Sequence, residues 1–331
     1  MWFNTEMKVT YLVILLLFVM PFFGGTYVTS FLVVMLMYMV LSLSYDIMGG
    51  MAGYLNFAHC TFFGVGAYFF GILYVRGFPL SLCFAIPVIV VLVYAAAVSY
   101  PLFRIRGVYF ALATLGLVKL IEQLALNLRD FTGGSAGLTV STGQPLDVSY
   151  YLVVILASLA FITNRIILRS KFGLALTAIR EDENVAESFG INSYICKTKA
   201  LLISATFAGI MGTIYMFYIA YIVPESVFGL ELVFSPAIMA MLGGTGTLFG
   251  PVLGAVLISV SQEILWTKLA YLHMATYGII FAAVGFYMPG GILREPWFRI
   301  FLDKIFGRFS NSKDEIATVN DIRHGGKNGN T

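Results

Sequence analysis

The sequence predicts an all-α, polytopic membrane protein with about ten transmembrane helices, some of them short or broken. Of 331 residues, 59% are apolar and only 11% are charged, and the mean hydropathy is +0.88. Soluble domains carry about a quarter charged residues. The apolar runs are continuous, whereas a transmembrane barrel needs alternating apolar and polar residues. A hydrocarbon core of about 30 Å needs about 20 residues of helix, so the apolar content suffices for about ten crossings.

The apolar runs predict helices at about 9–23, 28–47, 57–75, 80–103, 107–127, 150–168, 198–222, 231–243, 250–267 and 271–289. The first is short, and we interpret it as a signal anchor because no convincing cleavage site follows it. The stretch 231–243 is too short to cross a bilayer alone unless the helix is broken or Glu231 lies at the interface.

The distribution of Lys and Arg predicts the orientation, because cytoplasmic loops collect these residues. With both termini inside, most of the 20 Lys and Arg residues fall on the cytoplasmic side, Arg76, Arg129 and Lys268 fall outside, and Lys119 lies within a helix. Residues 1–309 then form a transmembrane domain with a cytoplasmic loop at 169–198. Residues 310–331 are polar, and we expect them to be a disordered cytoplasmic tail.

The long charged interruption of the membrane part, residues 165–199, predicts a short helix from about Glu183 to Phe189. Asp182 is a candidate N-cap and Gly190 a candidate C′ residue. A helix this short is marginal alone, because nucleation is costly. Either a partner protein holds it or it lies on the lipid surface, and the segment alone leaves both open.

Two glycine runs, GGMAGYLNF at 49–57 and GGTGTLFGP at 243–251, each separate two apolar helices. Glycine at membrane depth either permits close helix packing, which we expect for Gly64 and Gly66, or breaks a helix beside a cavity. Pro251 suits the first turn of a helix and favours a break there. The candidate pathway or helix-break residues are Gly49, Gly50, Gly53, His59, Gly243, Gly244, Gly246 and Pro251.

Neither run is a nucleotide-binding loop, because G-x-x-x-x-G-K-[ST] does not occur in the sequence. The energy for any transport must therefore come from a partner or from an ion gradient. An ion-coupled pathway needs ionisable groups in the membrane, and such groups are functional candidates by default.

The intramembrane candidates are Asp46, His59, Lys119, Glu122, Glu263 and His273. Asp46, Glu263 and His273 fall near predicted helix ends, where water is within reach. Lys119 and Glu122 share a helical face, so they form either a structural ion pair or a site. His59 is either a hydrogen-bonded packing residue or a pathway residue. No Cys, His and carboxylate pattern has metal or hydrolase spacing, so the sequence indicates no catalytic residues and no metal site.

Five ordered segments resemble one family: YDIMGGMAGYLNFAHCTFFGVGAY, RGVYFALATLGL, LNLRDFTGGSAGL, SKFGLALTAIREDENVAESFGIN and MLGGTGTLFGPVLGA. They are similar to the LivM-type permeases of branched-chain amino acid ABC importers. The resemblance implies a multi-pass subunit of the plasma membrane of a prokaryote, which is the inner membrane if the cell is Gram-negative. It also implies a homologous LivH-type permease, two cytoplasmic ABC ATPases and an extracytoplasmic amino-acid-binding protein as partners. No cofactor is expected on this chain, since ATP and Mg belong to the ATPases.

In that family the loop between the two halves carries a coupling helix that fits a cleft of the ATPase. The resemblance assigns this role to AIREDENVAESFG, with Glu187 and Gly190 matching the acid and the glycine of the pattern. Ser188 departs from it, since alanine is common there. The ATPase-coupling candidates are Arg180, Glu181, Asp182, Glu183, Ala186, Glu187 and Gly190. Relatives carry urea, amides or other amino acids, and an ion-coupled transporter is the alternative from another class.

Overall fold

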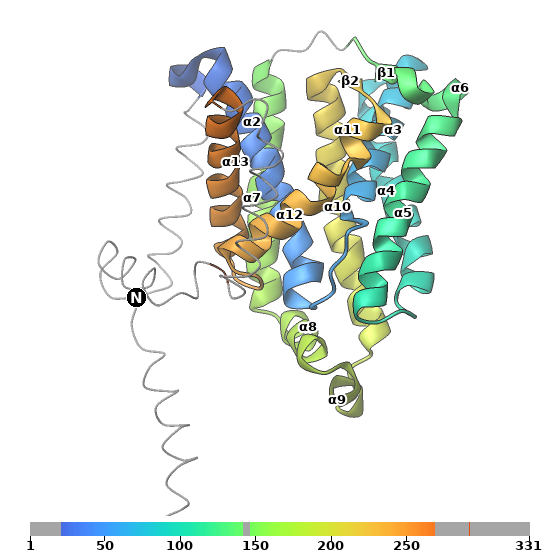
Figure 1. Ribbon diagram of the computed structural model, residues 1–331, viewed down its shortest axis with the longest axis vertical. Coiled ribbons are helices and arrows are strands. Elements are labelled where there is room, and N and C mark those ends of the chain that lie inside the picture. The colour runs from blue at the N-terminus through green and yellow to red at the C-terminus, as the bar shows by residue number, and fades with distance from the viewer. Residues whose placement is uncertain (1–20, 142–145, 269–290, 292–331) are drawn as a thin grey trace, which may run out of the picture.

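The computed structural model describes residues 21–141, 146–268 and 291, which form a bundle of long helices (Figure 1). The predicted helix at 271–289, most of the one at 9–23, His273 and the tail at 310–331 lie outside the described residues. The long helices are α2 (Pro21–Asp46), α3 (His59–Val75), α4 (Leu80–Leu102), α5 (Val108–Asn127), α7 (Leu146–Leu168), α10 (Ser193–Ile219), α12 (Leu230–Gly243) and α13 (Gly250–Lys268).

Six spans within the described ranges are long and apolar enough to cross a membrane. They are Gly25–Met51, Leu80–Leu102, Val108–Asn127, Leu146–Leu168, Ser193–Ile219 and Pro224–Gly243, and the shorter apolar helices His59–Val75 and Gly250–Leu265 accompany them. The first span joins α2 to a π-helical turn, Ile47–Met51. The prediction of an all-α membrane protein is confirmed.

The centre of the bundle is formed by α2 and α10. Helix α10 packs against α3, α4 and α2, and α2 also packs against α7, α12 and α13. Small residues bring α3 and α10 together, because a Cβ on Gly66 would lie 2.1 Å from the Gly209 carbonyl oxygen. Gly64 likewise lies against the ring of Phe228. The expected packing role of Gly64 and Gly66 is therefore confirmed.

The two ends of the bundle carry different short elements (Figure 1). Helices α8 (Lys171–Glu181) and α9 (Glu183–Ser188) lie beyond one end. At the other end lie α6 (Arg129–Thr132), a 3₁₀ turn (Gly134–Ala136), β1 (Leu138–Thr139) and β2 (Tyr221–Ile222). The strands pair antiparallel, Leu138 with Ile222, so the 128–149 connection is tied to the segment that follows α10.

Two predicted boundaries are wrong, those at the starts of α10 and α2, and one helix, α8, has no predicted bounds. Helix α10 begins at Ser193 rather than near 198, because the Asn192 side chain caps it and Lys197, which looked like a loop residue, has a partner inside the protein. The segment before Asp182 is a full helix, α8, whose Leu176 and Ile179 are buried. Helix α2 begins at Pro21 and has non-helical backbone at Gly25.

The stretch that looked too short to cross the bilayer is the second part of a broken helix. Helix α11 (Pro224–Phe228) precedes α12, and Gly229 between them has extended backbone. Together they span Pro224–Gly243, which is long enough to cross a membrane. The alternative that this segment is a broken helix is confirmed.

Candidate functional site

Helix α9 is closed at both ends as the sequence predicts. The Asp182 carboxylate accepts hydrogen bonds from the backbone N–H groups of Asn184 (2.8 Å) and Val185 (3.1 Å). Gly190 has a φ of 83°, and its N–H donates to the Glu187 carbonyl at 2.9 Å. The next N–H, of Ile191, donates to the Ala186 carbonyl at 3.1 Å, which completes a Schellman motif. The predicted cap residues are confirmed.

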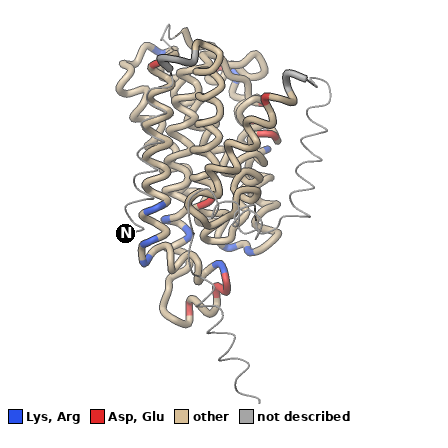
Figure 2. Tube along the Cα trace, turned by 90° about the vertical axis from the view of Figure 1, so that its left-hand side faces the viewer, with Lys and Arg blue, Asp and Glu red and all other residues tan. Residues whose placement is uncertain are grey.

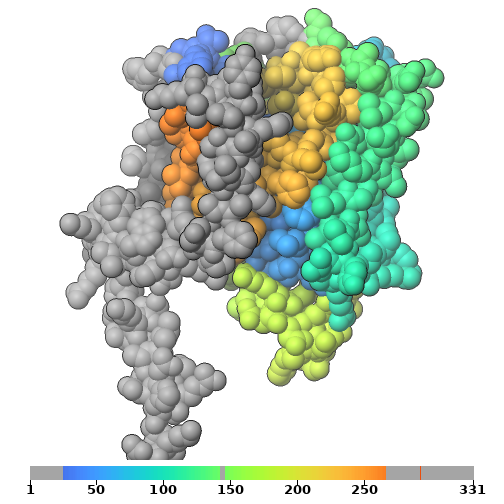
Figure 3. Space-filling view, viewed as in Figure 1, coloured from blue at the N-terminus to red at the C-terminus, as the bar shows by residue number. Residues whose placement is uncertain are grey.

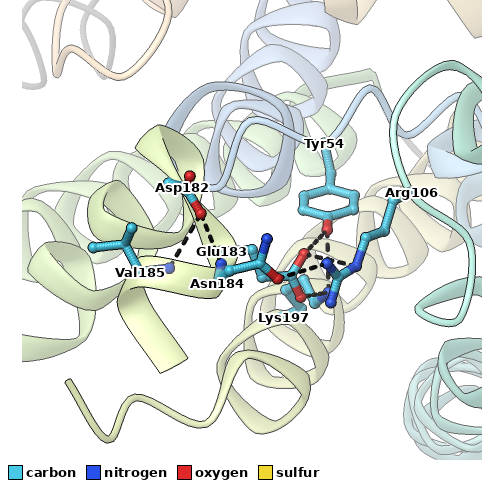
Figure 4. A network of polar contacts seen from close by, with 7 residues as sticks. All are labelled: Tyr54, Arg106, Asp182, Glu183, Asn184, Val185 and Lys197. Carbon is cyan, nitrogen blue, oxygen red and sulfur yellow. Dashed lines mark hydrogen bonds and ion pairs between the residues drawn. The ribbon is translucent and has the colours of Figure 1, made fainter. Parts of the chain in front are cut away.

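The inner face of α9 is held by one carboxylate, that of Glu183 (Figure 4). Its Oε1 lies 2.5 Å from the Lys197 Nζ, and its Oε2 accepts from the Tyr54 hydroxyl at 2.6 Å. The Arg106 guanidinium lies 3.5 Å from the same oxygen and donates to the Asn184 side chain at 3.1 Å. Charged groups from α9, α10 and the segment before α5 and a tyrosine hydroxyl from the segment before α3 thus meet at a single point.

The electrostatics of this point favour an ionised Glu183. Burial by itself would raise its pKa, but hydrogen bonds from Lys197 and Tyr54 and the positive charges of Lys197 and Arg106 hold the pKa below its ordinary value. Lys197 is almost fully buried, so this is a desolvated ion pair rather than a surface one. A six-residue helix has little stability alone, and the Lys197–Glu183 pair is the contact that holds α9 against the bundle.

The outer face of α9 is uncovered and carries two large apolar side chains. Val185 is 52% exposed and Phe189 is 83% exposed, the largest exposed fraction of any large hydrophobic side chain among the described residues. Glu187 and Gly190 are also exposed, whereas Ala186 is buried. The space-filling view shows the α8–α9 segment protruding from the end of the bundle (Figure 3).

Arg180, at the end of α8, connects this segment to both glycine runs. Its Nη1 donates to the Gly50 carbonyl at 2.7 Å, and a Cβ on Gly246 would lie 3.2 Å from the same nitrogen. A Cβ on Gly53 would lie 2.8 Å from the Arg180 Cγ. The two runs, about 200 residues apart in the chain, therefore lie side by side in the structure.

Asp46 joins the two runs directly. Its carboxylate is fully buried, and both of its oxygens accept a bifurcated hydrogen bond from the Gly246 N–H, at 2.9 and 3.2 Å. The expectation that Asp46 lies within reach of water is wrong. The π-helical turn extends α2 past Asp46 to Met51, and the loop that follows α12 covers the carboxylate. A buried carboxylate needs such donors.

The glycine residues of the two runs do different things. Gly49 and Gly50 lie inside the π-helical turn, so the first interruption begins only after Met51, and Gly53 (φ 76°) turns the chain. In the second run, Gly243 ends α12, Gly244 and Gly246 have positive φ, and Pro251 lies in the first turn of α13. The two runs therefore resemble each other in sequence more than in backbone conformation.

The other ionisable candidates are distributed through the bundle. His59 is buried at the start of α3, and its two ring nitrogens lie 3.1 Å from the Ser44 hydroxyl and 3.2 Å from the Ser204 hydroxyl. Lys119 and Glu122 form an ion pair of 2.7 Å. Glu263 on α13 accepts a hydrogen bond from the Tyr27 hydroxyl. In the described ranges no group of His, Cys and acidic residues is arranged to hold a metal.

Sequence reasoning missed Tyr54, Arg106 and Lys197 as partners of α9. Each looked like an ordinary residue of a loop or helix end, and only the fold brings them to Glu183 (Figure 4). One signal was available: Lys197 lies at helical spacing from the buried Ser193, Ala200, Leu201 and Ser204, whereas the neighbouring Lys199 does not and is exposed.

Long apolar helices that carry a pair of short helices anchored at one end define a polytopic membrane protein. The family described as branched-chain amino acid transport system / permease component matches residues 27–285. The chain belongs to this family. It is a permease subunit of the ABC importer class and not an enzyme.

Named relatives agree with this assignment. The high-affinity branched-chain amino acid transport system permease protein LivM of Escherichia coli is 30% identical over 291 residues, which cover 78% of this chain and 68% of that one. The protein of the same name from Salmonella typhimurium gives the same values. The probable branched-chain amino acid transport permease protein LivM of Methanocaldococcus jannaschii is 26% identical over 44% of this chain and 46% of its own. No solved structure matches this chain significantly.

Proposed function

We propose that this permease forms the membrane pathway for branched-chain or related hydrophobic amino acids. Transport would be driven by separate ATPases that bind α9. Its partners would be two cytoplasmic ABC ATPases, a homologous LivH-type permease and an extracytoplasmic amino-acid-binding protein. ATP and Mg would be bound by the ATPases, and no cofactor by this chain. The setting would be the plasma membrane of a prokaryote.

The observation that carries the proposal is the contrast between the two faces of α9. The inner face is anchored through the buried Lys197–Glu183 pair, whereas Phe189 on the outer side is 83% exposed. An exposed aromatic residue on a rigid helix has the properties of an interface anchor. The exposed Glu187 nearby adds a negative charge that a cleft in the ATPase could recognise through a positively charged group. A helix lying in lipid would not need the anchor on its inner side.

The side of the membrane is supported by charge. Arg104, Arg106, Arg169 and Lys171 gather at the α8–α9 end, where Figure 2 shows most of the blue segments of the bundle. Cytoplasmic loops collect Lys and Arg, so this end would face the cytoplasm, where ATP is available. The opposite end, with β1 and β2, would then face the binding protein.

The coupling would pass along contacts described above. ATP-driven closure of the ATPases moves α9 as a rigid body, and α8 moves with it because Asp182 links them with no further residue between. Arg180 passes the movement to Gly50 and to the adjoining Gly246 segment. Two packed states of the bundle would then alternate between opening outward and inward.

The test is a pair of variants of the outer face, Glu187→Arg and Phe189→Ala, in the importer reconstituted in proteoliposomes with all subunits. We expect both to insert and fold but to lose ATPase pull-down and ATP-dependent leucine uptake by at least about tenfold, which corresponds to about 1.4 kcal/mol of interface energy. The control is Ile166→Ala. It also removes an exposed apolar side chain (63% exposed), but one that lies on α7 and not on α9.

Three outcomes would count against the proposal. Unchanged uptake in both variants would remove the role of α9. Uptake of leucine by this chain without ATPases would indicate an ion-coupled transporter instead. Uptake of urea or an amide in preference to leucine would keep the ATP-driven class and change the substrate.

A further inference from the structure

The exposed face of α5 differs chemically in mid-helix from the exposed faces of α4 and α7. On α4 the exposed large side chains in mid-helix are Ile89 and Val93, and on α7 they are Ile155, Leu159 and Ile162. All of these are apolar, as contact with lipid requires. On α5 the exposed residues in mid-helix are Leu112, Gly116, Lys119, Leu120, Gln123 and Leu124. Among them Gly116, Lys119 and Gln123 are spaced by three and four and so share one face, which leucines flank.

These polar residues lie deep along the helix. Helix α5 has 20 residues, and Lys119 lies about 16 Å from its start at about 1.5 Å per residue. That is close to the middle of a hydrocarbon core of about 30 Å. A charged residue there is costly unless it meets water or protein, which makes this face unsuited to lipid. In the space-filling view α5 runs along one edge of the molecule (Figure 3).

The charged pair on this face is asymmetric. The Lys119 Nζ lies 2.7 Å from the Glu122 Oε2, but the Lys119 side chain is 55% exposed and that of Glu122 only 11%. The carboxylate is thus set into the bundle, and the ammonium group closes over it from outside. One turn earlier, a Cβ on Gly116 would have no heavy atom within 4 Å, so there is open space beside the pair.

A zwitterionic amino acid complements such a pair. Its carboxylate can bind the Lys119 ammonium while its own ammonium group binds the Glu122 carboxylate, so one internal ion pair is replaced by two intermolecular ones without net charge. A ligand with only one charge leaves one protein group unpaired, and the cost is largest for the Glu122 carboxylate, whose side chain is only 11% exposed. The apolar side chain can lie over Gly116 toward Leu112, which is 58% exposed.

We propose that the α5 face carrying Gly116, Lys119 and Gln123 lines the aqueous route, and that the Lys119–Glu122 pair binds the two charged ends of the amino acid in passage. This site rests on the proposed function for the identity of its ligand. The accessibility of the face does not depend on ATP or on transport, so the two proposals can fail separately.

The first experiment measures what the face contacts. Gly116→Cys and Ile89→Cys are made in a Cys196→Ala background, in which the remaining native Cys60 and Cys83 are buried. The full-length chain in its native membranes is treated with a charged, water-soluble thiol reagent and separately with a lipophilic maleimide. We expect Gly116→Cys to react with the charged reagent and Ile89→Cys, in mid-helix on the apolar α4 face, to react only with the lipophilic one.

Either of two results overturns the aqueous route. Reaction of Gly116→Cys with the lipophilic reagent alone would show a lipid-facing surface. No reaction with either reagent would show a surface covered by protein, such as the partner permease.

The second experiment tests the pair itself by ligand selectivity in the purified importer. The probes are leucine, 4-methylpentanoate, which lacks the ammonium group, and isoamylamine, which lacks the carboxylate. In the wild type, leucine should bind at least about tenfold tighter than either probe. Glu122→Gln should abolish the preference of leucine over 4-methylpentanoate, and Lys119→Gln its preference over isoamylamine.

A purely structural ion pair would not change selectivity in this paired manner. Equal loss of affinity for all three probes in both variants, or unchanged discrimination, would overturn the binding site. The circular dichroism and the thermal unfolding of each variant establish that the importer remains folded when the binding is measured.

Discussion

Arg180 and Gly50 are joined by a hydrogen bond of 2.7 Å from the guanidinium Nη1 to the backbone carbonyl, although 130 residues separate them in the chain. Arg180 lies at the end of α8, directly before α9, and Gly50 lies in the π-helical turn that ends α2. The Asp46 carboxylate, four residues before Gly50, holds the Gly246 N–H. A movement of α9 therefore has a short physical route to both glycine runs.

The first prediction concerns Arg180→Ala. Removing the guanidinium breaks the contact with Gly50 while α9 keeps its Glu183 anchor, so we expect the ATPases to bind and hydrolyse ATP while uptake falls by about tenfold or more. The measurement is the ratio of amino acid transported to ATP hydrolysed. Lys171→Ala, which removes a charge at the other end of α8, is the control and should leave that ratio unchanged. A normal ratio in Arg180→Ala would exclude a transmitting role for this contact.

The second prediction concerns Gly243→Ala. A Cβ there would lie 1.7 Å from the Gly250 carbonyl oxygen. Because this is a backbone atom, no side-chain rotation can relieve the clash. We expect a loss of stability of about 1–3 kcal/mol, seen as a lower midpoint of thermal unfolding in detergent.

Gly116→Ala is the matched control, since its Cβ would meet open space. It should be neutral or raise the stability by up to about 1 kcal/mol, because alanine is the better helix residue. Equal effects of the two substitutions would contradict the close approach at Gly243.

The third prediction concerns pH and Glu183. Because its folded-state pKa is lowered, its contribution to stability is fully present above the ordinary value of 4.5 and is lost as the pH falls through the lowered pKa. We expect hydrogen exchange of the α9 amides to accelerate below about pH 4.5, after correction for the intrinsic pH dependence of exchange.

Glu183→Gln should show the faster exchange already at pH 7 and no further acceleration on acidification. The amides of α10 near Ala205, in the bundle centre, are the internal reference. If Glu183→Gln titrated like the wild type, another group would be responsible.

The fourth prediction concerns Gly190→Val. With φ at 83° and nothing within 4 Å of the added Cβ, the cost is one of backbone conformation and not of packing. We expect a cost of about 1–2 kcal/mol, which frays the end of α9 and weakens ATPase pull-down. Asn, which tolerates this conformation, should retain most of the binding when substituted at the same position. Equal binding by Val and Asn variants would argue against the left-handed cap.

The sequence alone determined the features that depend on local chemistry. Within the described residues, continuous apolar runs sufficed for the membrane helices. Asp182 and Gly190 sufficed for the limits of α9, because caps act on neighbouring backbone groups. The helix-spaced pair of Lys119 and Glu122 was predicted for the same reason. The family resemblance also rests on short contiguous segments.

The tertiary structure decided which groups at distant positions meet. It buried Asp46 beneath the Gly246 segment, joined the two glycine runs through Arg180, and turned Glu183 inward to Tyr54, Arg106 and Lys197. A charge in a sequence looks solvated until a partner from another segment neutralises it, and such partners are set by how helices pack. The anchored inner face of α9 and its exposed outer face are therefore properties of the fold.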